Sequence, residues 1–124
     1  MRQTIRIFML FEAATFIAAP LIHSGVLIAG YEHHEARIAE AVIAIVLLGA
    51  VASTWIWPSW TRKVGLVGQG FALLGTLVGI FTIAIGVGPR TIPDIAYHLV
   101  IIAVLIWGLV VARRAPADDG KRQA

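Results

Sequence analysis

Four histidines are this chain's main candidates for chemistry, because it contains no cysteine and only seven acidic residues. His23 is followed by an adjacent pair, His33 and His34, and His98 lies much further along the chain. Imidazole together with carboxylate, in the absence of thiolate, favours copper(II), zinc, nickel or iron. Two histidines on different elements could equally be the axial ligands of a haem. A bound transition metal ion or haem is therefore the first hypothesis.

Charged side chains that could assist these histidines lie close to them. Asp94 precedes His98 by four residues, about one helical turn, so its carboxylate could bond one ring nitrogen and leave the other free. Glu40 could complete the ligand set of a metal, and Arg37 and Arg90 could pair with haem propionates. These four residues are the supporting members of the predicted site.

Each candidate also has a structural interpretation. The histidine pair fits a solvated polar loop, and the other two histidines could simply be hydrogen-bonded inside the protein. Thr91 precedes Asp94 by three residues, which is typical of a capping box at a helix start. The sequence leaves both interpretations open.

A second group of polar residues lies within apolar stretches. Glu12, Gln69 and Thr54 fall at a similar depth if those stretches are helices, and they could form a hydrogen-bonded cluster that holds the helices together. Glu12 could instead exchange protons. His23 follows it by eleven residues, which returns to within about 20° of the same helix face. A small proton-coupled transporter is the second hypothesis.

Glycines are concentrated in the third apolar stretch, where Gly75 and Gly79 form a small-xxx-small step. Small residues let helices approach closely in lipid. The step predicts helix packing within the chain or in a homo-oligomer, and the alternative is that it makes room for a flat cofactor. A third hypothesis follows, an accessory or scaffold subunit of a larger membrane complex without chemistry of its own.

The elements that must position these residues are four apolar stretches. They cover residues 7–29, 38–57, 64–87 and 95–112 of a chain that is 59% hydrophobic and only 14% charged. Each is long enough, or nearly so, to cross a hydrocarbon core of about 30 Å as a helix. Short connections make sequence neighbours antiparallel neighbours. The sequence therefore predicts an all-α protein, a four-transmembrane-helix antiparallel bundle over residues 1–114 with no soluble domain.

Lysine and arginine residues are distributed unevenly about the four stretches. Eight of the ten fall on one predicted side, and only Arg37 and Arg90 fall on the other. Because cytoplasmic segments carry the excess of basic residues, we expect a plasma (inner) membrane protein with both termini in the cytoplasm and the histidines near the outer leaflet. The polar tail, residues 115–124, is expected to be a disordered cytoplasmic segment. The lipid bilayer is the expected partner, and nucleic acid is not.

Catalytic signatures are missing from the sequence. It holds no glycine-rich phosphate loop, no GxSxG elbow and no HExxH motif. Hydrolysis is therefore disfavoured, and no catalytic residues are predicted.

Overall fold

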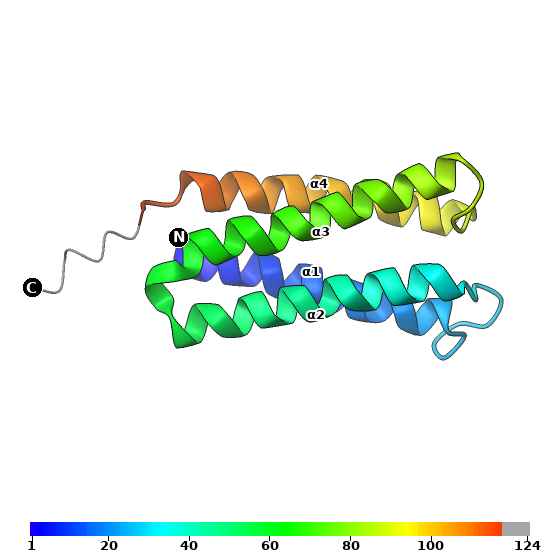
Figure 1. Ribbon diagram of the computed structural model, residues 1–124, viewed down its shortest axis with the longest axis horizontal. Coiled ribbons are helices and arrows are strands. Elements are labelled where there is room, and N and C mark those ends of the chain that lie inside the picture. Colours follow the sequence, from blue (N-terminus) through cyan, green and yellow to red (C-terminus); the bar gives the residue numbers. More distant parts are fainter. Residues whose placement is uncertain (118–124) are drawn as a thin grey trace, which may run out of the picture.

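The computed structural model describes residues 1–117, which form four long antiparallel helices and no strand. In chain order the elements are α1 (Arg2–His23), α2 (His34–Ile56), the short 3-10 helix η1 (Pro58–Trp60), α3 (Thr61–Ala84) and α4 (Ile92–Arg114). Figure 1 shows α1 and α2 side by side on one side of the bundle, with α3 and α4 on the other. Residues 118–124, most of the tail that was expected to be disordered, lie outside the described residues.

Four helices are long and apolar enough to cross a membrane. This confirms the predicted fold class. The start of α1 and the end of α4 lie at the same end of the bundle (Figure 1), as an even number of spans requires.

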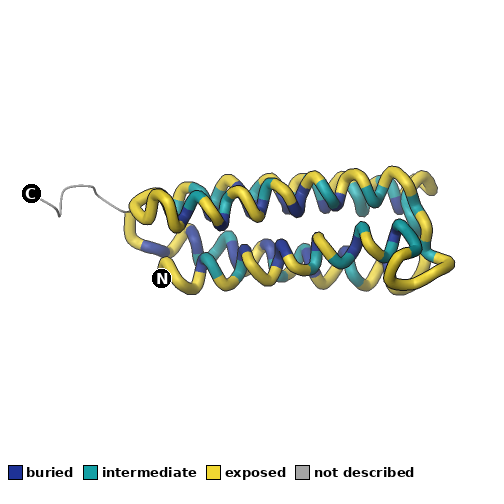
Figure 2. The backbone as a smooth tube through the Cα atoms, turned by 90° about the horizontal axis from the view of Figure 1, so that it is seen from below, coloured by how far each residue is buried: buried dark blue, intermediate teal, exposed yellow. Residues whose placement is uncertain are grey.

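Buried positions form one stripe along each helix. On α1 they recur every three or four residues, at Ile5, Met9, Ala13, Phe16 and Ala19 among others, which is the period of a helix with one inward face. Figure 2 shows these buried positions turned toward the space between the two helix layers. Large apolar side chains such as Ile45, Leu74 and Leu99 are exposed on the outside. An apolar exterior over a packed interior suits a lipid environment.

The first helix ends earlier than the hydropathy pattern predicts. It ends at His23, and residues 24–30 form turns instead of continuing the span to residue 29. Gly25 has a left-handed φ of 76°, a conformation that stops a helix and that glycine adopts without strain. His23 is therefore the last residue of α1, and the His33 backbone N–H returns to donate to the His23 carbonyl at 2.9 Å.

Side chains cap two helices at this end of the bundle. The Nδ1 atom of His33 accepts a hydrogen bond from the Ala36 backbone N–H at the start of α2. Thr91 Oγ1 accepts from the Asp94 backbone N–H at the start of α4, and the Thr91 hydroxyl donates to the Asp94 carboxylate. The predicted capping role of Thr91 is confirmed.

The two glycines of the small-xxx-small step face partners within the chain. A Cβ atom built on Gly75 would lie 2.8 Å from Ile43 Cδ1, and one built on Gly79 would lie 2.9 Å from His98 Nε2. Both distances are shorter than real Cβ contacts, so the absent side chains are what let α3 pack against α2 and α4. At both positions the neighbouring atoms belong to this chain.

Candidate functional site

Three buried charged side chains meet where α1 ends and where α2 and α4 begin. His23 Nδ1 lies 2.7 Å from Glu40 Oε2, and His23 Nε2 lies 2.9 Å from Asp94 Oδ1. All three residues are at most 7% exposed. His23 is the last residue of α1, and the turn that follows contains Gly25, so this imidazole lies at the helix end between Glu40 of α2 and Asp94 of α4. We call these three residues the outer cluster.

With only the two protons that its hydrogen bonds need, the outer cluster carries a net charge of −1. Each of the two contacts needs one proton, because a carboxylate oxygen and an unprotonated ring nitrogen are both acceptors. A neutral imidazole supplies one proton, so the cluster must hold one more. That proton makes either an imidazolium between two carboxylates or a neutral imidazole beside one carboxylic acid, and the sum of charges is the same.

The four-residue spacing predicted that the Asp94 carboxylate orients His98. The structure shows a different contact. His98 Nδ1 lies 2.7 Å from the Asp94 backbone carbonyl oxygen. The carboxylate is already engaged by His23 and by the Thr91 hydroxyl, and the carbonyl of residue i−4 is the nearer acceptor within a helix. The carbonyl only accepts, so Nδ1 carries the hydrogen and Nε2 of the neutral ring is an acceptor.

The remaining predicted residues lie in or beside the connecting loops. His33 Nε2 donates to the Val87 carbonyl oxygen at 3.2 Å, and its ring lies edge-on to that of His23 with centroids 6.4 Å apart. His34 Nδ1 accepts from Arg37 at 2.8 Å.

The Arg90 side chain also bonds to backbone groups. It donates to the carbonyl oxygens of Ile83 and Ala84, so it completes the end of α3. Neither Arg37 nor Arg90 is paired with a carboxylate among residues 1–117.

The histidines do not converge on one point in the described part of the chain. Residues 1–117 contain no group of three or more histidine, aspartate or glutamate side chains arranged to hold a metal ion. Both nitrogens of His23 are bonded to carboxylates, so an ion shared by His23 and His98 would first have to displace Glu40 or Asp94. His98 Nε2 has no hydrogen-bond partner among the described residues and stays available to a ligand.

A second buried polar site lies deeper in the bundle, around Glu12 on α1. Glu12 and Gln69 are both 0% exposed, and neither oxygen of the Glu12 carboxyl has a hydrogen-bond partner in residues 1–117. Gln69 donates to the Gly65 carbonyl at 3.0 Å, whereas its Oε1 also lacks a partner there. We call Glu12 and Gln69 the inner pair.

Gly108 of α4 makes room for the inner pair. A Cβ atom built on Gly108 would lie 1.9 Å from Gln69 Oε1 and 2.8 Å from Glu12 Oε1. The two side chains therefore approach the same place beside Gly108, and the structure shows no direct hydrogen bond between them. Sequence reasoning missed Gly108; the available signal was a glycine among the bulky residues of the fourth apolar stretch.

Thr54 is not part of this pair. It is held by Arg6, whose Nε donates to Thr54 Oγ1 at 3.0 Å and whose Nη2 donates to the Thr54 carbonyl at 2.6 Å. Arg6 is one of the eight basic residues on the predicted cytoplasmic side. Arg6 lies closer to the start of α1 than Glu12 does, and its long side chain reaches Thr54 on α2. Depth in the bundle alone had grouped this threonine with Glu12.

Two cavities adjoin the outer cluster. One of about 480 Å³ lies between α1 and α4 and is lined by Thr15, His23, Asp94 and Tyr97 among others. The other, of about 170 Å³, is lined by residues of α2, α3 and the α3–α4 loop together with His98. His23 and His98 thus open into different cavities although both are bonded to Asp94.

The fold and these sites define a small helical membrane protein with two separated groups of buried polar residues. No protein family matches the chain, and neither a curated protein nor a solved structure was found to be similar to it.

Proposed function

We propose that this protein is a small proton-coupled transporter in which Glu12 is the proton-exchanging group. The observation that carries the proposal is the Glu12 carboxyl itself, fully buried and without a hydrogen-bond partner for either oxygen in residues 1–117. A charged carboxylate is costly at this depth unless a cation or water reaches it. Exchange of a proton at Glu12 would thus accompany any change in access to the bundle interior.

The outer cluster supports a proton route toward the other surface. Glu12 and His23 both belong to the buried face of α1, at a separation of about 16 Å along a helix of this rise. The 480 Å³ cavity covers part of that distance, because its lining reaches from His23 to Thr15, which lies about one turn from Glu12 on α1. We also propose the plasma membrane location with both termini in the cytoplasm, so that Glu12 lies in the inner half and His23 near the outer surface.

Charge movement on a pH jump tests this proposal without knowledge of the cargo. Protein reconstituted on a solid-supported membrane should give a transient current when the outside pH is stepped, because a proton that binds inside the membrane moves charge. Glu12→Gln should abolish the transient current, and Glu12→Asp should retain part of it. The control is Glu35→Gln, since the Glu35 side chain is 77% exposed at the start of α2. A Glu12→Gln protein with an unchanged current would contradict the proposal.

Metal or haem binding is the second candidate. It is favoured by one observation, the unpartnered His98 Nε2 beside a cavity that Glu40 and His33 also line. An absorption spectrum and elemental analysis of the purified protein test it, and loss of the bound group in His98→Ala is the expected result. No observation favours the third hypothesis, an accessory subunit in an oligomer or larger complex, and it stays a prediction.

A further inference from the structure

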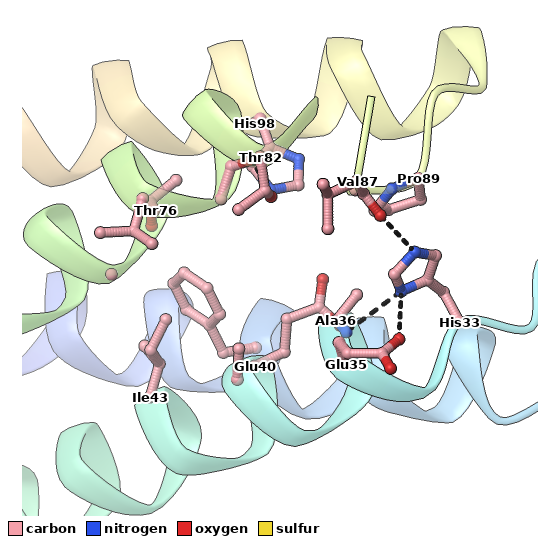
Figure 3. A pocket seen from close by; sticks show the side chains of 16 residues that line it. His33, Glu35, Ala36, Glu40, Ile43, Thr76, Thr82, Val87, Pro89 and His98 are labelled. Atoms are coloured by element: carbon pink, nitrogen blue, oxygen red, sulfur yellow. Dashed lines mark hydrogen bonds and ion pairs between the residues drawn. The ribbon is translucent and has the colours of Figure 1, made fainter. Parts of the chain in front are cut away.

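The 170 Å³ cavity beside His98 has an unusual set of polar groups. Figure 3 shows the Glu40 side chain and the His98 ring reaching into it from opposite sides, with Thr76 and Thr82 on the α3 wall. Glu40 and His98 are 5% and 7% exposed, so both polar groups are shielded from bulk water. A single water needs on the order of 10–15 Å³, so the cavity has room for a small molecule.

Hydrogen-bond donors on the cavity wall are already committed to the protein. The Thr76 hydroxyl donates to the Ala72 carbonyl and the Thr82 hydroxyl to the Gly79 carbonyl, each at 2.7 Å. The ring N–H of His33 donates to the Val87 carbonyl oxygen. What these side chains can still offer to a molecule in the cavity is oxygen lone pairs.

The two strongest polar groups on the wall are also acceptors. Glu40 Oε1 is buried and has no partner among residues 1–117, while Oε2 of the same carboxylate bonds His23. His98 Nε2 is an acceptor because Nδ1 holds the ring hydrogen against the Asp94 carbonyl. A buried hydrogen-bond acceptor without a donor is costly in free energy, so this wall favours a ligand that carries hydrogen-bond donors.

The net charge of the groups beside the cavity is negative. The outer cluster, to which Glu40 belongs, carries −1, and the exposed Glu35 carboxylate lies at the cavity edge. None of the described residues that line the cavity is lysine or arginine. A cation would therefore neutralise a charge that the protein leaves uncompensated in a buried position.

We propose that this cavity binds a small primary ammonium ion, whose N–H groups donate to Glu40 Oε1, His98 Nε2 and the threonine oxygens. An ammonium group supplies both features that the wall lacks, several donors and one positive charge. A bare transition metal ion fits less well, because residues 1–117 hold no group of three or more histidine, aspartate or glutamate side chains that could ligate one. This binding site is separate from the inner pair and does not depend on proton exchange at Glu12.

Equilibrium titration of the purified protein in detergent tests the site. Methylammonium should bind, whereas tetramethylammonium, which has the same charge but no N–H group, should bind at least about tenfold more weakly, as expected for the loss of a charge-assisted hydrogen bond. Equal affinity for the two ions would overturn the proposal. Binding of zinc with no binding of methylammonium would overturn it too, and would favour the metal hypothesis.

Variants of residues that line the cavity test whether methylammonium binds there. Gly79→Ala puts a methyl group 2.9 Å from His98 Nε2 and should abolish methylammonium binding, whereas its matched control on the same helix, Gly70→Ala, meets nothing within 4 Å and should bind normally. Thr76→Val removes one acceptor that bonds only its own helix, so it keeps the fold testable and should weaken binding several-fold. Unchanged affinity in both Gly79→Ala and Thr76→Val would contradict the site.

Discussion

Asp94 and His98 are joined by a hydrogen bond between the His98 ring and the Asp94 backbone carbonyl, not the Asp94 carboxylate. This leaves the carboxylate to the cap at Thr91 and to His23 of α1. One residue thus fixes the tautomer of one histidine through its backbone and pairs with another histidine through its side chain.

Removal of the His23 imidazole should destabilise the protein strongly. His23→Ala leaves the Glu40 and Asp94 carboxylates buried without their common partner, and loss of one member of a buried ionic group costs about 3–5 kcal/mol. Chemical unfolding in detergent measures this. The control, His34→Ala, removes an exposed histidine at the start of α2 and should change stability by less than about 0.5 kcal/mol. Equal stability of the two variants would mean that the outer cluster does not hold the helices together.

Neutralising Asp94 should partly offset the loss of stability that His23→Ala causes. In the double variant His23→Ala with Asp94→Asn, one of the two stranded carboxylates becomes neutral, so the combined loss of stability should be smaller than the sum of the two single losses. A double-mutant cycle gives the coupling between the residues directly. Strict additivity would show that the 2.9 Å contact between His23 and Asp94 carries no coupling energy.

A methyl group at Gly108 should disturb the inner pair. Its Cβ atom would lie 1.9 Å from Gln69 Oε1, so Gln69 or α4 must move, and overpacking of this kind costs about 1–3 kcal/mol. Gly70→Ala on α3 is the control, because it has free space and gains helix propensity of up to about 1 kcal/mol. The thermal midpoints of the two variants in detergent should therefore move in opposite directions. A Gly108→Ala protein as stable as the parent would argue against the close approach.

Glu12→Gln should fold better than Glu12→Ala. Glutamine fills the same space and its amide N–H can donate to Gln69 Oε1, whereas alanine leaves a gap and an unpartnered buried oxygen that costs about 1–3 kcal/mol. Thermal unfolding of the two variants decides the point. Identical midpoints would show that Glu12 has no structural role.

Labelling of introduced cysteines should reveal the orientation, since the chain has no cysteine of its own. Glu35 is exposed at the start of α2, and Ser59 is exposed in η1, just beyond the other end of α2, so Glu35→Cys and Ser59→Cys place the labels at opposite ends of the bundle. In intact cells an impermeant maleimide should label Cys at position 35, and label Cys at position 59 only after permeabilisation. The reverse pattern would invert the proposed topology.

The architecture followed from hydropathy and short connections, because a chain in lipid must satisfy its backbone polar groups within helices. The shared face of Glu12 and His23 followed from helical periodicity, and both residues are buried. The partner of His23 could not be found this way. Glu40 bonds His23 at the last residue of α1, and the apolar residues Val26, Leu27 and Ile28 gave the turn that follows the composition of a membrane span.

Side-chain reach explains the other difference. Equal depth grouped Thr54 with Glu12, but depth takes no account of the flexible Arg6 side chain that bonds Thr54 across two helices. Pairing between side chains on different helices depends on helix rotation and on rotamers, which hydropathy does not encode.

A net charge of −1 on the outer cluster makes the protein interact with the membrane voltage even when nothing is bound. A unit charge that crosses the whole membrane exchanges about 2.3 kcal/mol with a potential of 100 mV. In the proposed orientation, the fixed negative charge lies toward the outer side and most of the arginines and lysines lie toward the inner side. An inside-negative potential favours both placements, so an energised membrane should itself help to keep the bundle inserted in one direction.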